Sequence, residues 1–190
     1  MRRSDRTSED AAVTALALAA GGGDRAALAE FIARSQSDVW RFLAHLTDAD
    51  AADDLTQETY LRAMDALPGF RAEASARTWL LTIARRAAVD RVRGQRAHPL
   101  ILVEPGRCLI PPVPDGALGV EIGRMLASLE PDRREALVLT QVLGYRYAEA
   151  AAIVGVRVGT IRSRVARARA ELVATWSDAA AHLDALRPAG

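Results

Sequence analysis

A chain of 190 residues, half of them apolar, is long enough to build one domain or two small ones around a packed core. Aromatic residues make up only 5%, and alanine and leucine outnumber the β-branched residues, so the composition favours helices over sheets. The formal net charge is +1, and the single cysteine, Cys108, excludes a disulfide framework and a cysteine-based zinc site.

Membrane and export signals are missing from the sequence pattern. The polar N-terminus carries no apolar core of the kind that a signal peptide needs. No apolar run approaches the roughly 20 residues that span a bilayer. These features predict a soluble, cytoplasmic protein without a membrane segment of its own.

The first half of the chain reads as a series of helices. Residues 1–10 are polar and are expected to be frayed, and a helical pattern then runs to the glycines at 21–23. Apolar residues at helical spacing predict further helices over about 24–46, from the acidic turn at 48–53 to Pro68-Gly69, and over about 75–95. Asp50 or Asp53 is expected to cap the second of these helices. Residues 11–96 are therefore predicted to form one helical domain.

The second half begins with a linker. Residues 97–116 hold five of the eight prolines, which rules out a helix there, although the segment also carries an apolar patch at 100–103. Residues 117–174 are predicted to form a second helical domain, and residues 175–190 a tail that extends the last helix or frays. Within this domain a short helix ends at Gly155 and a longer basic helix follows after a short turn. This succession is the helix-turn-helix pattern, so the predicted fold is all-α with two small domains.

The basic helix, "GTIRSRVARARAEL" over 159–172, has a clear division of faces. Apolar side chains recur every three or four residues and predict a buried stripe of Ile161, Val165, Ala168 and Leu172. The adjacent outward face holds Arg162, Ser163, Ala166 and Arg167, with Arg164 and Arg169 on its flanks. In a DNA major groove, arginine can bind guanine through two hydrogen bonds, while serine and alanine contact polar edges or thymine methyl groups.

A basic helix face can also be merely a solvated surface. No acidic residue lies between Arg157 and Arg169, however, so ion pairs between neighbouring helix turns do not explain the cluster. The short helix and turn before it supply the geometry that presents such a face to DNA. Together these features favour DNA binding.

The N-terminal half shows a separate division of charge. Residues 48–58 contain five acids and no base, whereas residues 77–96 contain six arginines and one acid, Asp90. The two segments could simply pair with each other. The arginines are nevertheless too many for one patch of carboxylates, which indicates a further partner of negative charge.

These segments together resemble a known family. The stretches "DDLTQETYLRAMDALPGF" and "ARTWLLTIARRAAVDRVRGQR" are similar to region 2 of bacterial sigma factors of the extracytoplasmic-function (ECF) group. The stretch "YAEAAAIVGVRVGTIRSRVARARAEL" is similar to region 4.2 of the same group. The resemblance covers about residues 25–96 and 117–174, in the order of the family and with a linker between.

The resemblance implies a dissociable subunit of RNA polymerase that selects promoters and is not an enzyme. It implies that the helix after the acidic turn binds the β′ clamp through Asp53, Asp54, Gln57, Glu58 and Arg62. It also implies that the basic segment binds and melts the −10 element through Arg77, Trp79, Arg85, Arg86, Asp90, Arg93 and Arg96. Family members often carry asparagine at the position of Arg86; arginine offers only donors, which changes the base that this position can read. Trp79 has a second interpretation as a core residue.

For the second domain, the resemblance implies that the duplex −35 element is bound by Arg157, Thr160, Arg162, Ser163, Arg164, Ala166, Arg167 and Arg169. Arg162, Ser163, Ala166 and Arg167 would read bases, and Arg157, Arg164 and Arg169 would contact phosphates. Core RNA polymerase, through its β′ clamp and β flap, and promoter DNA are the implied partners, and an anti-sigma factor is a further one. Docking of the two domains on each other is an alternative off state.

A stand-alone regulator and an enzyme are the two alternative classes of function. A stand-alone helix-turn-helix regulator would explain residues 117–174, but not the acidic and basic helices of the first domain. An enzyme is disfavoured because Asp53 and Asp54 have no histidine or cysteine partner and point about 100° apart on a helix. The sequence also has no glycine-rich phosphate loop. We therefore expect no cofactor, no metal and no catalytic residue.

Overall fold

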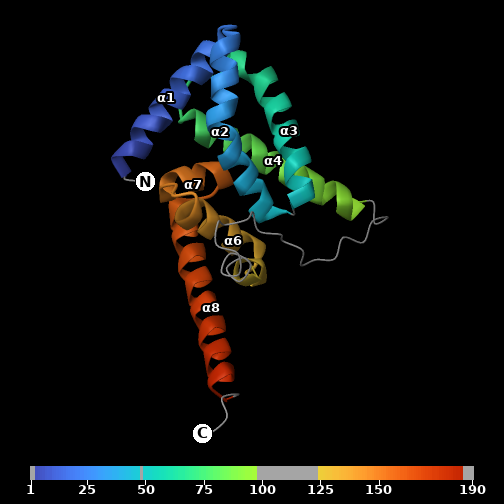
Figure 1. Ribbon diagram of the computed structural model, residues 1–190, viewed down its shortest axis with the longest axis vertical. Coiled ribbons are helices and arrows are strands. Elements are labelled where there is room, and N and C mark those ends of the chain that lie inside the picture. The colour runs from blue at the N-terminus through green and yellow to red at the C-terminus, as the bar shows by residue number, and fades with distance from the viewer. Residues whose placement is uncertain (1–2, 48, 98–123, 186–190) are drawn as a thin grey trace.

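The computed structural model describes residues 3–47, 49–97 and 124–185. Within these ranges the regular elements are helices, which confirms the predicted all-α class. Figure 1 shows helices α1 to α4 in the upper part of the molecule, α6 and α7 beneath them, and α8 extending away as a long rod. None of the helices in the described part is both long and apolar enough to cross a membrane.

The N-terminal helices follow the predicted boundaries closely except at the start. They are α1 (Arg3–Gly21), α2 (Arg25–Leu46), α3 (Ala49–Ala66), the 3-10 turn η1 (Leu67–Gly69) and α4 (Ala76–Ala97). The expectation of a frayed N-terminus is wrong from residue 3 onward, because α1 begins there. Neither Asp50 nor Asp53 caps α3, since both lie inside it. Asp24 caps α2 by accepting from the backbone N–H groups of Ala26 and Ala27 at 2.9 and 3.0 Å.

The C-terminal helices form the predicted helix-turn-helix. They are α6 (Pro131–Leu137), the π-helical segment η2 (Val138–Val142), α7 (Tyr147–Val154) and α8 (Val158–Ala185). Pro131 occupies the first position of α6, where its missing N–H costs nothing. Gly155 ends α7 with a φ of 76°, a left-handed conformation that glycine adopts without strain. Helix α8 continues past the predicted boundary at 174, and the greater part of the expected linker lies outside the described residues.

Large apolar side chains from several helices meet in the N-terminal half. The fully buried ones include Phe31, Phe42 and Leu43 from α2, Leu55 from α3 and Leu80 from α4. The hydroxyls of Ser35 and Tyr60 satisfy each other inside this core at 2.7 Å. Burial raises the pKa of Tyr60 to about 12, so its hydroxyl stays protonated.

The two halves pack against each other. Helix α4 contacts α7, and α2 contacts α6, so the buried residues of both halves form one continuous cluster. The facing helices carry small buried residues: Ala84, Ala87 and Ala88 on α4, and Ala150 and Ala151 on α7. Small side chains allow two helix backbones to approach closely. The two predicted bodies are thus docked in this structure.

A buried histidine near this contact predicts how stability depends on pH. Burial, together with Arg41 and Arg134, lowers the pKa of His45 from 6.5 to about 4. At a pH between these two pKa values, His45 is protonated in the unfolded chain and neutral in the folded chain. The contribution of His45 is therefore complete above pH 6.5 and is lost as the pH falls toward 4. We expect a loss of about 3 kcal/mol.

The measurement is urea unfolding of the wild type and of His45→Gln between pH 7 and pH 4. Carboxylates titrate in the same range in both proteins, so the difference between the two free energies of unfolding isolates His45. That difference should shrink by about 3 kcal/mol on acidification. A constant difference would show that His45 titrates normally in the folded chain.

Candidate nucleic-acid and polymerase interface

The outward face of α8 is built by burial of its opposite face. Ile161, Val165 and Ala168 are at most 2% exposed and fasten α8 to the rest of the molecule. The side chains expected to read bases all lie on the exposed face: Arg162, Ser163, Ala166 and Arg167. The exposed face and three of the four residues of the predicted stripe fall where the helical spacing predicts them, whereas Leu172 is only half-buried.

The remaining residues of the expected −35 set differ in their exposure and in their hydrogen-bond partners within the protein. Arg164 is half-buried and donates to the carboxylate of Asp132 on α6. Arg169 donates to the amide oxygen of Gln141 at 2.5 Å. Arg157 is exposed in the turn before α8, and the carbonyl of half-buried Thr160 accepts from the Ser163 hydroxyl at 2.9 Å. To contact a DNA phosphate, Arg164 would have to break its ion pair with Asp132, whereas Arg157 has no such ion pair among the described residues.

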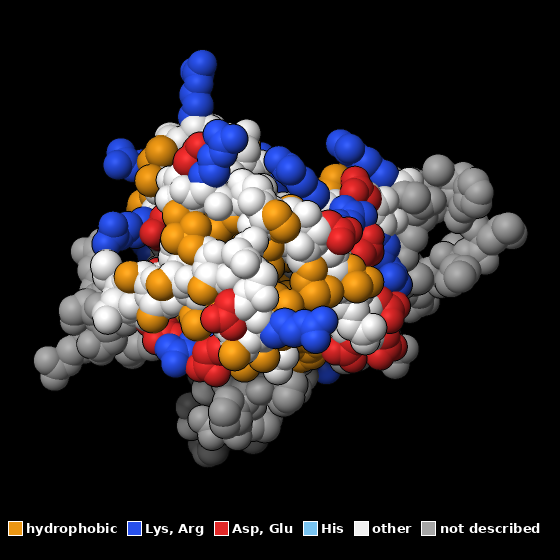
Figure 2. Space-filling view, turned by 90° about the horizontal axis from the view of Figure 1, so that it is seen from above, with side chains coloured by type: hydrophobic (Ala, Val, Ile, Leu, Met, Phe, Trp, Pro, Cys, Tyr) orange, Lys and Arg blue, Asp and Glu red, His pale blue; other side chains and the backbone are white. Residues whose placement is uncertain are grey.

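The acidic face of α3 is exposed and organised by donors from neighbouring helices. Asp53 accepts from the indole N–H of Trp40 at 2.6 Å, and Asp54 pairs with Arg91 at 3.5 Å. Gln57, one turn further along α3, is exposed as well. Figure 2 shows acidic side chains gathered on the side of the molecule where α3 lies in Figure 1, with basic ones beside them. The α3 face therefore presents exposed carboxylates, two of which have partners on α2 and α4.

Arg62 connects this face to α4. Its guanidinium donates to Glu58 at 2.5 Å and to Asp90 at 3.1 Å. Asp90, which we expected to serve the −10 element, thus faces the residues expected to bind polymerase. The two predicted sites adjoin each other at this ion pair.

The basic side chains of α4 do not share one environment. Arg86 and Arg93 are exposed, and the side chain of Arg96 lies outside the described residues. Arg85 is only 25% exposed, and its Nε and Nη2 donate to the two oxygens of the Glu135 carboxylate of α6, at 2.7 and 3.3 Å. Burial raises the pKa of Glu135, and the Arg85 guanidinium acts against that rise.

Two residues of the expected −10 set take part in the core. Arg77 is 8% exposed and lies among the carboxylates of Asp38, Asp10 and Glu9, at 2.5, 3.4 and 3.5 Å. The expectation that Arg77 contacts DNA has to be revised, because its donors are directed into the protein. Trp79 is half-buried and packs against Phe70 with ring centroids 4.9 Å apart. Of its two interpretations, packing is the one that this contact supports.

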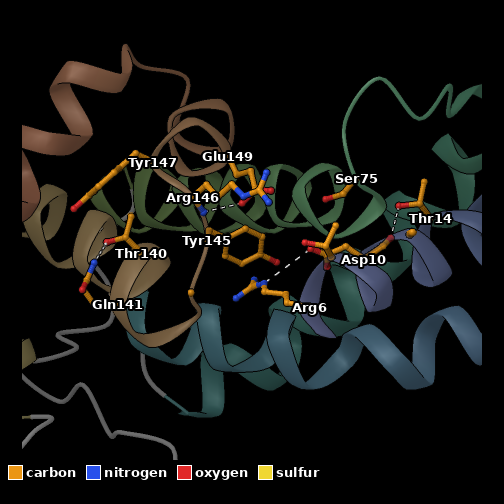
Figure 3. Close-up of a pocket in the computed structure, with 13 residues that line it drawn as sticks. Arg6, Asp10, Thr14, Ser75, Thr140, Gln141, Tyr145, Arg146, Tyr147 and Glu149 are labelled. Carbon is orange, nitrogen blue, oxygen red and sulfur yellow. Dashed lines mark hydrogen bonds and ion pairs between the residues drawn. The ribbon is translucent and has the colours of Figure 1, made fainter. Parts of the chain in front are cut away.

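Several residues at the contact between the halves were missed by sequence reasoning. Arg6 of α1 donates to the carbonyl of Leu143 and lies over the Tyr145 ring, 4.3 Å from its centroid. Arg6 and Tyr145 border a cavity of about 590 Å³, also lined by Asp10, Arg146 and Glu149, as Figure 3 shows. Nothing in the sequence signals this arrangement, since Arg6 lies in a segment expected to be frayed.

Comparison with known proteins identifies the family. A model described as Sigma-70 region 2 matches residues 31–98, and one described as Sigma-70 region 4 matches residues 119–172. The ECF RNA polymerase sigma factor SigC of Mycobacterium tuberculosis is 53% identical over 176 residues, which cover 88% of this chain and 92% of the relative. The chain belongs to the ECF sigma factors. The resemblance predicted from its motifs is therefore confirmed, and the family is one of transcription initiation factors.

Solved structures agree with this assignment. The sigma factor RpoE of Bartonella quintana, in complex with the anti-sigma factor NepR, has a TM-score of 0.67 and 30% identity, covering 75% of this chain and 92% of RpoE. CnrH, in complex with the cytosolic domain of CnrY, has a TM-score of 0.68 and 28% identity, covering 88% of this chain and 98% of CnrH. A further relative, found by sequence, is the ECF RNA polymerase sigma factor EcfG of Rhodopseudomonas palustris. It is 38% identical, and the match covers 67% of this chain and 72% of the relative.

The buried position of Arg77 yields a prediction about stability. Arg77→Ala should lower the free energy of unfolding by about 3 kcal/mol, because it removes the cation paired with the Asp38 carboxylate and leaves Asp10 with Arg6 alone, 3.9 Å away. Urea unfolding checks this, with Arg34→Ala as control because that arginine makes only exposed ion pairs, to Glu30 and Glu9. An Arg77→Ala protein of normal stability that failed only in promoter melting would return Arg77 to the DNA-binding set.

Proposed function

We propose that this ECF sigma factor, in the cytoplasm, binds core RNA polymerase through the exposed acids of α3. It then directs initiation by melting the −10 element with α4 and reading the −35 element with α8. It performs no catalysis itself. The observation that carries the proposal is the presence of two separate exposed surfaces of opposite charge, on α3 and α8, in a chain of this family. A carboxylate face suits a basic protein partner, and a basic helix suits DNA.

The −35 proposal rests on the shape of the α8 face as well as its charge. Ser163 and Ala166 are small and lie between Arg162 and Arg167, so the helix backbone can approach the floor of a major groove. Neither Arg162 nor Arg167 has an ion pair among the described residues, so binding DNA would cost neither of them an internal contact. We assign these two to base reading and the exposed Arg157 to a phosphate.

The −10 proposal rests on the exposed part of α4. Arg86 and Arg93 are accessible to a DNA strand, and a melted strand presents phosphates and unstacked bases to such groups. Arg86 can donate to base acceptors such as guanine O6 and N7, but it cannot accept a hydrogen bond as an amide would. We therefore assign to position 86 a base with an acceptor edge.

The polymerase proposal rests on Asp53, Asp54 and Gln57. Their carboxylates and amide are exposed on one face of α3, and the apolar side of the same helix is buried through Ala51, Ala52 and Leu55. Trp40 and Arg91 hold the two aspartates in place. Fixed carboxylates lose little side-chain entropy on binding, which favours recognition of a basic helical surface.

A stand-alone helix-turn-helix regulator is the competing function. Transcription in vitro with sigma-free core polymerase and genomic fragments separates the two. The sigma factor should direct initiation from discrete start sites, which can be mapped, and should need core polymerase for tight, specific DNA binding. Specific binding by the purified chain alone, without initiation, would support the regulator.

An anti-sigma factor is a further proposed partner. Among the solved relatives, RpoE is bound to the anti-sigma factor NepR, and CnrH is bound to the cytosolic domain of CnrY. The exposed α3 face of this chain is a surface that an inhibitor of polymerase binding could cover.

The base-reading face yields a prediction on specificity. Arg162→Ala or Arg167→Ala should weaken use of a mapped promoter by roughly 1–3 kcal/mol and relax the preference at particular −35 bases. Abortive transcription from a set of single-base −35 variants measures this. Arg157→Ala is the matched comparison, since loss of a phosphate contact should weaken all variants equally. A uniform loss for Arg162→Ala and Arg167→Ala as well would contradict base reading.

The acidic face yields a prediction on polymerase binding. Asp54→Lys should abolish co-purification with core polymerase, because it reverses a charge on the proposed contact face. Asp65→Lys is the control, since Asp65 is exposed on the same helix outside the proposed set. Far-UV circular dichroism should show both variants folded. Binding retained by Asp54→Lys, or lost equally by both, would remove the clamp assignment.

A further inference from the structure

Two arginines of α8 that the resemblance assigns to phosphates have chemically different partners. Arg164 donates to the carboxylate of Asp132 on α6, so its charge is compensated within the protein. Arg169 donates instead to the amide oxygen of Gln141 in η2 at 2.5 Å. It has no ion pair among the described residues. A neutral acceptor holds a guanidinium without cancelling its charge, so the charge of Arg169 stays available to a DNA phosphate.

Gln141 is itself held by a short chain of hydrogen bonds. Its Nε2 donates to the Thr140 hydroxyl at 3.1 Å, a bond drawn in Figure 3, and that hydroxyl donates to the backbone carbonyl of Ala136 at 2.8 Å. Arginine offers only donors, so the amide has to turn its oxygen toward Arg169 and its nitrogen toward Thr140. The direction of the Arg169 guanidinium is thereby tied to the backbone of α6.

The segment that carries Gln141 has an unusual backbone. In η2 the N–H of Leu143 donates to the carbonyl of Val138, five residues earlier, at 2.9 Å. Such π-helical turns are rare and often lie at functional sites. Val138 and Leu139 are buried in this turn, whereas Gln141 is exposed and contacts α8 through Arg169. The π-helical turn therefore coincides with the residues that hold this arginine.

Arg169 lies in line with the proposed base-reading face. It follows Arg162 by seven residues, which is two turns of α8, so the two side chains leave the helix in directions that differ by about 20°. The same seven residues advance the helix by about 10 Å, which is close to the width of a major groove. The N-terminal residues of a recognition helix contact bases. A guanidinium two turns further along is therefore placed at the edge of the groove, where the phosphates lie.

We propose that Gln141 is a positioning residue of the −35 interface, which directs Arg169 toward a phosphate beside the bases read by Arg162 and leaves its charge intact. Gln141 acts through Arg169. Arg164, whose charge is compensated by Asp132, holds α8 on α6 instead of binding DNA. This inference rests on the proposed function and deepens it by adding a phosphate contact and the residue that orients it.

The test measures binding of a promoter fragment by holoenzyme, reconstituted from core polymerase and the full chain, over a range of salt concentrations. Each lost phosphate contact lowers the slope of log affinity against log salt concentration by about 0.9. Arg169→Ala should show this loss. Gln141→Glu should show it too, with binding about fivefold or more weaker at low salt, because the carboxylate neutralises Arg169. Gln141→Ala should weaken binding about two- to threefold at an unchanged slope, because the guanidinium keeps its charge and loses its fixed direction.

Two controls separate positioning from other effects of the substitutions. Gln36→Glu adds the same charge at an exposed glutamine of α2, outside the proposed interface, and should leave affinity and slope unchanged. In an Arg169→Ala background, neither substitution of Gln141 should have a further effect, because the residue through which Gln141 acts is gone. Gln141 is exposed, so thermal melts of its variants should match the wild type. An early melt would show a structural role instead of a positioning one.

The other outcomes overturn the inference in distinguishable ways. A wild-type slope for Gln141→Glu would show that the charge of Arg169 does not serve DNA binding. An equal effect of Gln141→Glu with and without Arg169 would show that the carboxylate repels DNA directly. Wild-type binding that does not depend on the −35 sequence would refute the proposed function. Normal −35 dependence with unaffected Gln141 variants would refute this inference alone.

Discussion

A guanidinium group stays charged throughout the pH range in which proteins are folded, so every buried arginine needs acceptors. This constraint separates the arginines of the chain into groups with different tasks. Arg77 is surrounded by three carboxylates and holds α1, α2 and α4 together. Arg6 and Arg85 find their acceptors on the opposite half of the molecule. Arg86 and Arg167 are exposed and are among those proposed to bind DNA.

The arginines at the contact between the halves occupy an intermediate position. Their acceptors, the Leu143 carbonyl and the Glu135 carboxylate, belong to the other half, and Arg6 has a second partner in Asp10 of its own helix. The carboxylates of Arg77, in contrast, lie in the same half. The two sets of contacts are chemically similar, but one holds the N-terminal half together and the other joins the two halves.

Alanine serves the same arrangement by allowing close packing. The facing surfaces of α4 and α7 carry small buried residues, so the helices approach without large interlocking side chains. The N-terminal half is instead packed around large side chains such as Phe31 and Phe42.

The sequence by itself determined the helical class, nearly all helix boundaries, the two regions of the family and the faces of α8. These features depend on local spacing: Ile161, Val165 and Ala168 recur with the period of a helix, and Gly155 favours a left-handed turn. Only the tertiary structure decided which arginines are available. Arg77 and Arg86 lie on one helix in similar sequence surroundings, yet one is buried among carboxylates from α1 and α2 and the other is exposed. Likewise, Arg6 and Glu135 gained their partners because packing brought distant segments together, and spacing along the chain carries no record of that.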